Sequence, residues 1–292
     1  MNSSARAGLV TDLPPARRLE RGGMGLLLSE YPAEQPWMKL LVSHGFGEHR
    51  GWYDHLARTL QAQGISTFVF DHFHHGRSDG ESAAVPRYGV LVDGLLLALE
   101  QGVGPSRELP LALLGHSNGA LIILHALRRI AAGAVSRVVL SNPLLGMAPP
   151  LSLLENLPLR LAKWLPVGAR IPLRPQPARL TGDTSVWEDY RRDPLRFRSV
   201  TLRFLAEMGR ASRQARRGFD CLGVPLLLLC GELERVVNPA ATRAWFQRLR
   251  DVNKRLIVYR GLRHELFNET QWQTVVGDMV TWLKEGSPVK QA

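Results

Sequence analysis

The chain has 292 residues, of which 45% are hydrophobic and 22% charged, as in a globular protein with one large domain. The formal net charge is +11, yet we find no basic motif with interleaved aromatic residues and no recognition-helix pattern, so we expect no nucleic-acid partner. The two cysteines, Cys221 and Cys230, match neither a disulfide framework nor a metal-ligand spacing, and we expect no metal ion and no cofactor.

The sequence shows neither a signal-peptide pattern near residue 1 nor a candidate membrane-spanning segment. Met1 to Arg21 contains arginines but no apolar core of signal-peptide length, and nowhere do about 18 apolar residues run together. We therefore expect a cytoplasmic protein. Residues 1–22 are predicted to be a poorly ordered lead-in, and residues 286–292 a polar tail.

Strands and helices alternate through the first half of the chain. The strands are nearly continuous apolar runs, which indicates a parallel sheet buried on both faces. Strands are predicted over 23–31, 37–43, 65–70, 111–116 and 137–141, and helices over 53–62, 90–103 and from 118 to about 132.

The alternation stops after residue 143, where prolines, arginines and short helical patterns take over. Strands resume at 224–230 and 254–259, each followed by a helix, over 239–249 and 270–284. We therefore predict a discontinuous core, 23–143 and 218–285, interrupted by a cap at 144–217 that covers the carboxyl ends of the strands. The stretch 151–165 in this cap is apolar with a few basic residues. It could lie at a membrane interface or be an ordinary cap helix.

Ser117 lies in the sequence Gly115-His-Ser-Asn-Gly119, between a predicted strand and a predicted helix. This context is typical of a nucleophile elbow, a tight turn whose flanking positions must lack a bulky Cβ atom. We predict Ser117 as the nucleophile.

A serine nucleophile needs a base and an acid, which follow it along the chain in this kind of fold. Among the nine histidines only His264 follows the last predicted strand, so it is the candidate base. The loop after 224–230 holds two carboxylates, and we favour Glu234 over Glu232 as the acid. The backbone N–H groups of Phe46 and Asn118 are the candidate oxyanion donors.

Several motifs together resemble the monoacylglycerol lipase and lysophospholipase branch of the α/β-hydrolase superfamily. They are His44-Gly-Phe-Gly-Glu-His49 followed by Tyr53, Asp71 with His75-Gly-Arg-Ser78, the serine motif, Tyr190-Arg-Arg-Asp-Pro-Leu195, Gly231-x-x-Glu234 and Gly261 with His264-Glu. The resemblance covers residues 24–284. It implies an α/β-hydrolase fold, a mostly parallel central sheet with helices on both faces and an inserted helical cap.

The resemblance also implies a substrate site. It places the triad on Ser117, Glu234 and His264, and a glycerol headgroup against Glu48, His116 and Tyr190. Trp52 stands where the family has an arginine that also serves the headgroup. His74 replaces a usual glycine, Asn118 a typical methionine, and Glu234 the more common aspartate.

The function expected from these residues is that of a serine hydrolase acting on lipid-like carboxylic esters, of monoacylglycerol or lysophospholipid type, through an acyl-enzyme intermediate. An acyltransferase or thioesterase-like tailoring enzyme would use the same triad, and a non-catalytic binding protein on this fold is a third alternative. The expected partners are the lipid-like substrate and an anionic membrane surface touched peripherally. The sequence leaves the oligomeric state open.

Overall fold

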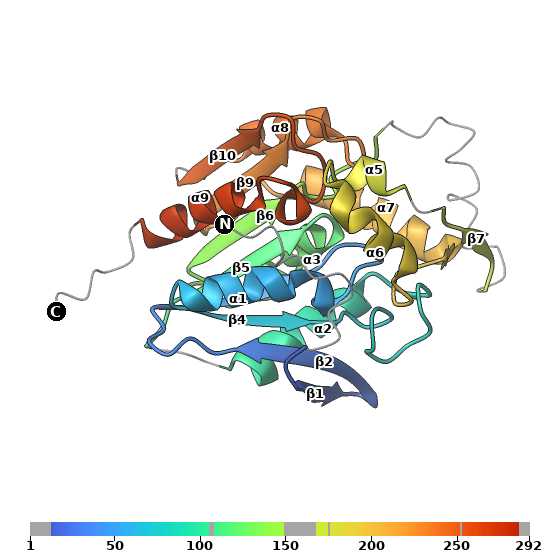
Figure 1. Ribbon diagram of the computed structural model, residues 1–292, viewed down its shortest axis with the longest axis horizontal. Helices are drawn as coiled ribbons and strands as arrows, with labels where there is room; N and C mark the ends of the chain where they lie inside the picture. The colour runs from blue at the N-terminus through green and yellow to red at the C-terminus, as the bar shows by residue number, and fades with distance from the viewer. Residues whose placement is uncertain (1–12, 105–107, 149–167, 175, 252, 286–292) are drawn as a thin grey trace.

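The computed structural model describes residues 13–104, 108–148, 168–174, 176–251 and 253–285. Eight strands form one twisted sheet in the order β1-β2-β4-β3-β5-β6-β9-β10, shown in Figure 1. From β4 to β10 neighbouring strands are parallel, whereas β1 and β2 pair antiparallel at one edge. The strands are β1 (Ala16–Arg21), β2 (Met24–Tyr31), β3 (Met38–Ser43), β4 (Ile65–Phe70), β5 (Leu111–His116), β6 (Arg137–Ser141), β9 (Leu226–Gly231) and β10 (Lys254–Tyr259).

Both faces of the sheet are buried, because successive apolar residues of each strand point to opposite sides. In β9, Leu226 and Leu228 belong to one hydrophobic cluster, and Leu227 and Leu229 to the other. Helices α1 (Asp54–Ala62) and α9 (Trp272–Lys284) cover one face. Helices α2 (Gly89–Leu97), with its continuation Ala98–Val103, α3 (Asn118–Ala126) and α8 (Pro239–Arg248) cover the other. The predicted α/β architecture is confirmed.

Two predictions at the borders of elements are wrong. The predicted lead-in over residues 1–22 includes strand β1, which turns into β2 through Gly22 and Gly23, both at positive φ. Only Leu19 of β1 is buried, so the sequence of this strand has no alternating apolar pattern to detect. The strand is stabilised by its hydrogen bonds with β2. The elbow helix ends at Ala126 rather than near residue 132, and the chain continues in turns such as Arg129 N–H to Ala126 O.

The inserted segment lies at the end of the sheet to which the arrowhead of β4 points (Figure 1). Its strands β7 (Arg170–Pro172) and β8 (Ser199–Thr201) pair antiparallel, a small sheet that the sequence did not predict. Its helices are α5 (Pro177–Leu180), the short turn Thr184–Val186, α6 (Trp187–Arg192) and α7 (Leu202–Gly218). Helix α7 lies against α3. His125 Nε2 of α3 is 3.0 Å from Ala211 O of α7. The stretch 151–165 falls outside the described residues.

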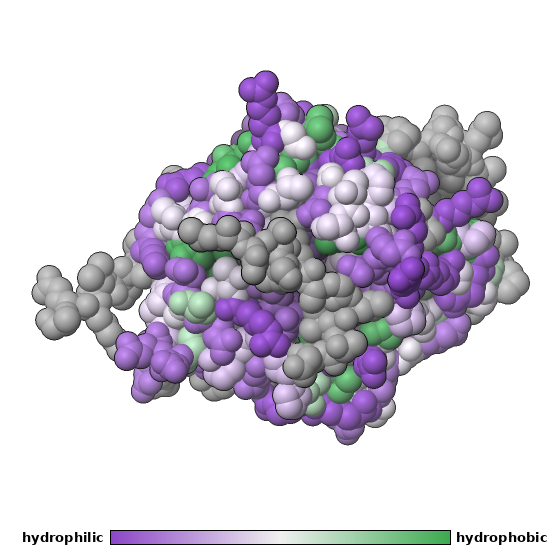
Figure 2. All heavy atoms as spheres, viewed as in Figure 1, coloured by the Kyte–Doolittle hydropathy of each residue, from purple (hydrophilic) through white to green (hydrophobic). Residues whose placement is uncertain are grey.

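The visible surface is mostly hydrophilic, with small scattered apolar patches (Figure 2). Over the part of the chain that the structure describes, no helix has both the length and the apolar character needed to cross a membrane.

Candidate active site

Ser117 occupies the sharp turn between β5 and α3, at φ 52° and ψ −113°. A non-glycine residue at positive φ is strained and persists where surrounding contacts hold it. Its N–H donates to Ser141 O at 2.9 Å and its carbonyl accepts from Leu144 N at 3.1 Å. A Cβ atom at Gly119 would lie 1.9 Å from Ser43 O, and one at Gly115 2.6 Å from Ala120 Cα. The close packing that the motif predicts is therefore present.

The imidazole of His264 and the carboxylate of Glu234 form a buried pair. His264 Nδ1 lies 2.6 Å from Glu234 Oε2, and the other oxygen, Oε1, accepts from the N–H groups of Val236 and Val237 at 2.5 and 3.0 Å. Burial lowers the pKa of His264, but the charge and hydrogen bond of Glu234 outweigh it and raise the pKa above 6.5. Burial raises the pKa of Glu234, but His264 and the two N–H groups outweigh it and lower the pKa. The pair is thus suited to hold a proton on the imidazole.

Glu232, the other carboxylate considered, has a different partner. Its Oε2 accepts from Gly261 N at 2.9 Å, and its side chain is exposed. Of the two carboxylates, the one bonded to His264 is Glu234.

Asn142 links the two loops that carry this pair, a position that sequence reasoning missed. Its Nδ2 donates to His264 O at 2.7 Å, and its Oδ1 accepts from Gly231 N at 3.2 Å. Asn142 lies at φ 40°, where asparagine is tolerated better than most residues. The sequence shows that Asn142 directly follows a predicted strand, but not that it bonds the loop of His264.

The loop after β3 approaches the elbow from the other side. Gly47 lies at φ 70°, and the Phe46 ring packs against Phe197 at 5.1 Å between centroids. Asn118, the first residue of α3, is buried, and its Oδ1 accepts from Tyr88 OH at 2.9 Å. The Nδ2 atom of Asn118 has no hydrogen-bond partner among the described residues.

Two of the predicted headgroup residues, Glu48 and His116, lie together beside Gly45. A Cβ atom there would come within 3.1 Å of both side chains, so glycine lets them converge. Glu48 Oε2 accepts from Gly45 N at 2.7 Å and from Tyr53 OH at 2.8 Å. The His116 ring lies 4.7 Å from the His264 ring, centroid to centroid, which brings this group next to the His264–Glu234 pair.

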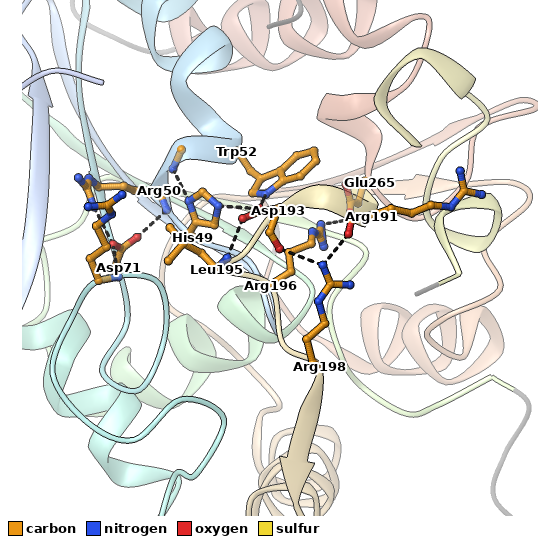
Figure 3. A network of polar contacts seen from close by, with 12 residues as sticks. His49, Arg50, Trp52, Asp71, Arg191, Asp193, Leu195, Arg196, Arg198 and Glu265 are labelled. Carbon is orange, nitrogen blue, oxygen red and sulfur yellow. Dashed lines mark hydrogen bonds and ion pairs between the residues drawn. The ribbon is translucent and has the colours of Figure 1, made fainter. Parts of the chain in front are cut away.

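The other two, Trp52 and Tyr190, meet where the cap contacts the core. Their rings lie 5.9 Å apart, and Trp52 Nε1 donates to Asp193 Oδ2 at 2.6 Å. The same oxygen lies 2.8 Å from His49 Nε2 (Figure 3). Asp193 has no exposed surface, so this contact fastens the Tyr190–Leu195 motif of the cap to the motif that follows β3.

Arg196 is a second residue that sequence reasoning missed. Its guanidinium carbon lies 3.4 Å from the centroid of the Tyr190 ring, and Nη2 donates to Glu265 Oε1 at 3.0 Å. Burial raises the pKa of Glu265, and neighbouring cations only partly offset this. Arginine is so frequent in the cap that this one could not be distinguished by its sequence.

A mostly parallel eight-stranded sheet, a serine at a strained strand-to-helix turn, and a His–Glu pair on the following loops together define an α/β-hydrolase. The family described as Serine aminopeptidase, S33 (Hydrolase_4) matches residues 34–271. The monoglyceride lipase of Homo sapiens is 32% identical over 241 residues, covering 82% of this chain and 78% of its own.

Two further comparisons agree. The monoacylglycerol lipase of Mycolicibacterium smegmatis is 28% identical over 271 residues, covering 90% of this chain and 94% of its own. A soluble variant of monoglyceride lipase from Saccharomyces cerevisiae has the same fold, with a TM-score of 0.84 at 21% identity, and the match covers 96% of this chain and 98% of that one. The chain belongs to the Hydrolase_4 family of α/β-hydrolases, in its monoacylglycerol lipase-like branch, and is a carboxylic ester hydrolase.

Proposed function

We propose that this enzyme hydrolyses monoacylglycerol-type esters through an acyl-enzyme formed on Ser117. The observation that carries the proposal is the buried His264–Glu234 pair at 2.6 Å, on loops beside a strained serine turn. A triad needs this arrangement, because the acid fixes the imidazole tautomer and stabilises the imidazolium.

The chemistry follows in two steps. His264 Nε2 takes the proton of the Ser117 hydroxyl as Oγ attacks the ester carbonyl, and the N–H groups of Phe46 and Asn118 stabilise the oxyanion. The imidazolium gives its proton to the departing alcohol, which leaves the acyl group on Oγ. Water, activated by His264, then releases the fatty acid. An acyltransferase would admit an alcohol in place of this water.

A serine-directed fluorophosphonate tests the nucleophile. It should label the parent, and Ser117→Ala should abolish both the labelling and ester turnover. Labelling that survives the substitution would place the nucleophile elsewhere.

The headgroup assignment rests on Glu48, His116 and Tyr190. We expect a higher kcat/KM for a monoacylglycerol than for the methyl ester of the same fatty acid, and Tyr190→Phe should reduce this preference. If the parent prefers the methyl ester, the headgroup assignment is wrong and only a general esterase activity remains.

Peripheral contact with an anionic lipid surface belongs to the same proposal. Residues 144–217 carry 14 Lys and Arg against 6 Asp and Glu, and such cations favour anionic headgroups. The alternative is that these charges are simply solvated.

A further inference from the structure

Arg196 is held in one orientation by contacts on three sides. Its guanidinium carbon lies 3.4 Å from the Tyr190 ring centroid and 4.5 Å from that of Trp52, and Nη2 donates to Glu265 at 3.0 Å. The side chain is 6% exposed. A planar guanidinium stacked in this way loses little further freedom when it donates to a ligand.

Several buried side-chain nitrogens have no hydrogen-bond partner among the described residues, Asn118 Nδ2 included, and two of them lie in the predicted headgroup region. These two are Arg196 Nε and His116 Nε2, and the latter is 3.7 Å from the nearest oxygen of Glu48, too far for a hydrogen bond. A buried polar group without a partner is costly, so native structures rarely contain one without a role. The His116 ring lies 4.7 Å from the His264 ring, and Arg196 bonds the side chain of Glu265, the residue that follows His264.

Arg196 places a cation next to the Trp52 and Tyr190 rings. The indole and the Tyr190 ring are both within cation–π range of the guanidinium. A cation therefore does occupy this region, but the cap provides it rather than the loop after β3.

Carboxylates lie close to this cation, and one of them, Glu265, forms a buried ion pair with it at 3.0 Å. Burial lowers the pKa of Arg196, but Tyr190 and the carboxylates of Glu265, Glu48 and Asp193 outweigh it and raise the pKa. The guanidinium charge is thus already balanced within the protein. An added phosphate would be repelled by these carboxylates, whereas an uncharged hydroxyl could form hydrogen bonds there without a charge penalty.

We propose that Arg196 donates hydrogen bonds to the uncharged, hydroxylated alcohol part of the ester and so selects monoacylglycerols over lysophospholipids with an anionic headgroup. Arg196 is a specificity-determining residue, and Glu265 positions it. The inference rests on the proposed function, since it concerns the same ester site.

The test compares kcat/KM for a monoacylglycerol with that for the methyl ester of the same fatty acid. The double variant Arg196→Met, Glu265→Gln removes the ion pair without leaving a buried charge alone. Its monoacylglycerol-to-methyl-ester ratio should fall about tenfold or more, the effect of one charged hydrogen bond. Arg196→Lys keeps the charge without the planar group and should lose part of the ratio, which tests the inference even if the double variant does not fold.

Arg192→Met is the matched control. Arg192 is another cap arginine, but it is 73% exposed and pairs with Glu188 on the same helix, so its removal should leave the ratio unchanged. A parent that prefers the monoacylglycerol, with variants that keep that preference, would overturn the role of Arg196 and leave the proposed function standing. A parent with no such preference would contradict both.

A lysophosphatidic acid of the same acyl chain tests the charge argument. The parent should cleave it with a lower kcat/KM than the monoacylglycerol. Glu265→Gln should reduce this difference in kcat/KM, because the variant lacks one of the carboxylates that repel the phosphate. A parent that prefers the anionic ester would identify Arg196 as a phosphate-binding residue and overturn the inference.

Discussion

His264 Nδ1 and Glu234 Oε2 lie 2.6 Å apart, a short bond between two side chains that are almost fully buried. A glutamate is one methylene longer than an aspartate, the other carboxylate that such a triad can use. The N–H groups of Val236 and Val237 both hold its Oε1, which fixes the longer side chain and leaves Oε2 for the imidazole. The extra methylene is therefore accommodated by the local turn.

Glu234→Gln should lower kcat by about four orders of magnitude, the effect of losing the corresponding acid in a serine protease. The variant should also have a changed pH profile. His264 must be neutral to act as a base, and Glu234 raises its pKa. Without that carboxylate the imidazole releases its proton at a lower pH, so the acid limb of kcat/KM should move to lower pH. The measurement is kcat/KM on a soluble ester between about pH 5 and 9.

Glu232→Gln is the control for this experiment, because Glu232 is exposed and bonds the Gly261 N–H instead. It should change kcat little and leave the acid limb in place. If Glu232→Gln has the larger effect, the assignment of the acid is wrong.

Asn142 is expected to position the loop of His264 rather than to touch the substrate. Asn142→Gly keeps the positive φ but removes the bonds to His264 O and Gly231 N. Since small misplacements of catalytic groups can cost about 100-fold, kcat should fall about 10- to 100-fold with little change in KM. A variant with a lower melting temperature but unchanged kcat would show that Asn142 serves stability alone.

His74 lies at φ 65°, a backbone conformation that glycine adopts more readily than other residues. Its Nδ1 lies 3.0 Å from Glu81 O, a contact that helps to hold the turn. His74→Ala removes this contact and retains the strain, whereas His74→Gly removes both. The glycine variant should be more stable than the alanine variant by about 1 kcal/mol, measured by urea denaturation. Equal stabilities would mean that the turn relaxes away from positive φ.

Contact of the cap with anionic lipid predicts a dependence on charge and salt. Hydrolysis of a monoacylglycerol in vesicles containing phosphatidylglycerol should be faster than in phosphatidylcholine vesicles. The difference should shrink as salt rises, since exposed charges are screened over about 10 Å at 0.1 M. Equal rates on both surfaces at low and high salt would favour an ordinary cap with solvated charges.

The sheet could be predicted because its signal is local. Each central strand is a short apolar run bounded by turn residues, and the strand predicted at 254–259 coincides with β10. Strand β1 is rich in arginine, and β7 and β8 are only three residues long. Each is stabilised by pairing with a neighbouring strand. Such strands have no periodic signal of their own.

The residues of the candidate site also divide into those with a local signal in the sequence and those without one. Ser117 and His264 could be proposed because a motif and the chain order identify them, and Glu234 because it follows a strand end. Asn142 and Arg196 could not, since their partners are 122 and 69 residues away in the chain. Contacts of that range depend on how the loops are folded, which one sequence does not reveal.

The late position of β10 in the chain also affects when activity can arise during synthesis on the ribosome. The loop that carries His264 follows this strand, and both are synthesised long after Ser117. A ribosome-bound chain that ends before β10 holds the elbow but no base to activate it. Under the proposed mechanism the growing polypeptide therefore has no esterase activity until synthesis has passed His264, and C-terminal truncations that remove β10 should be inert as enzymes.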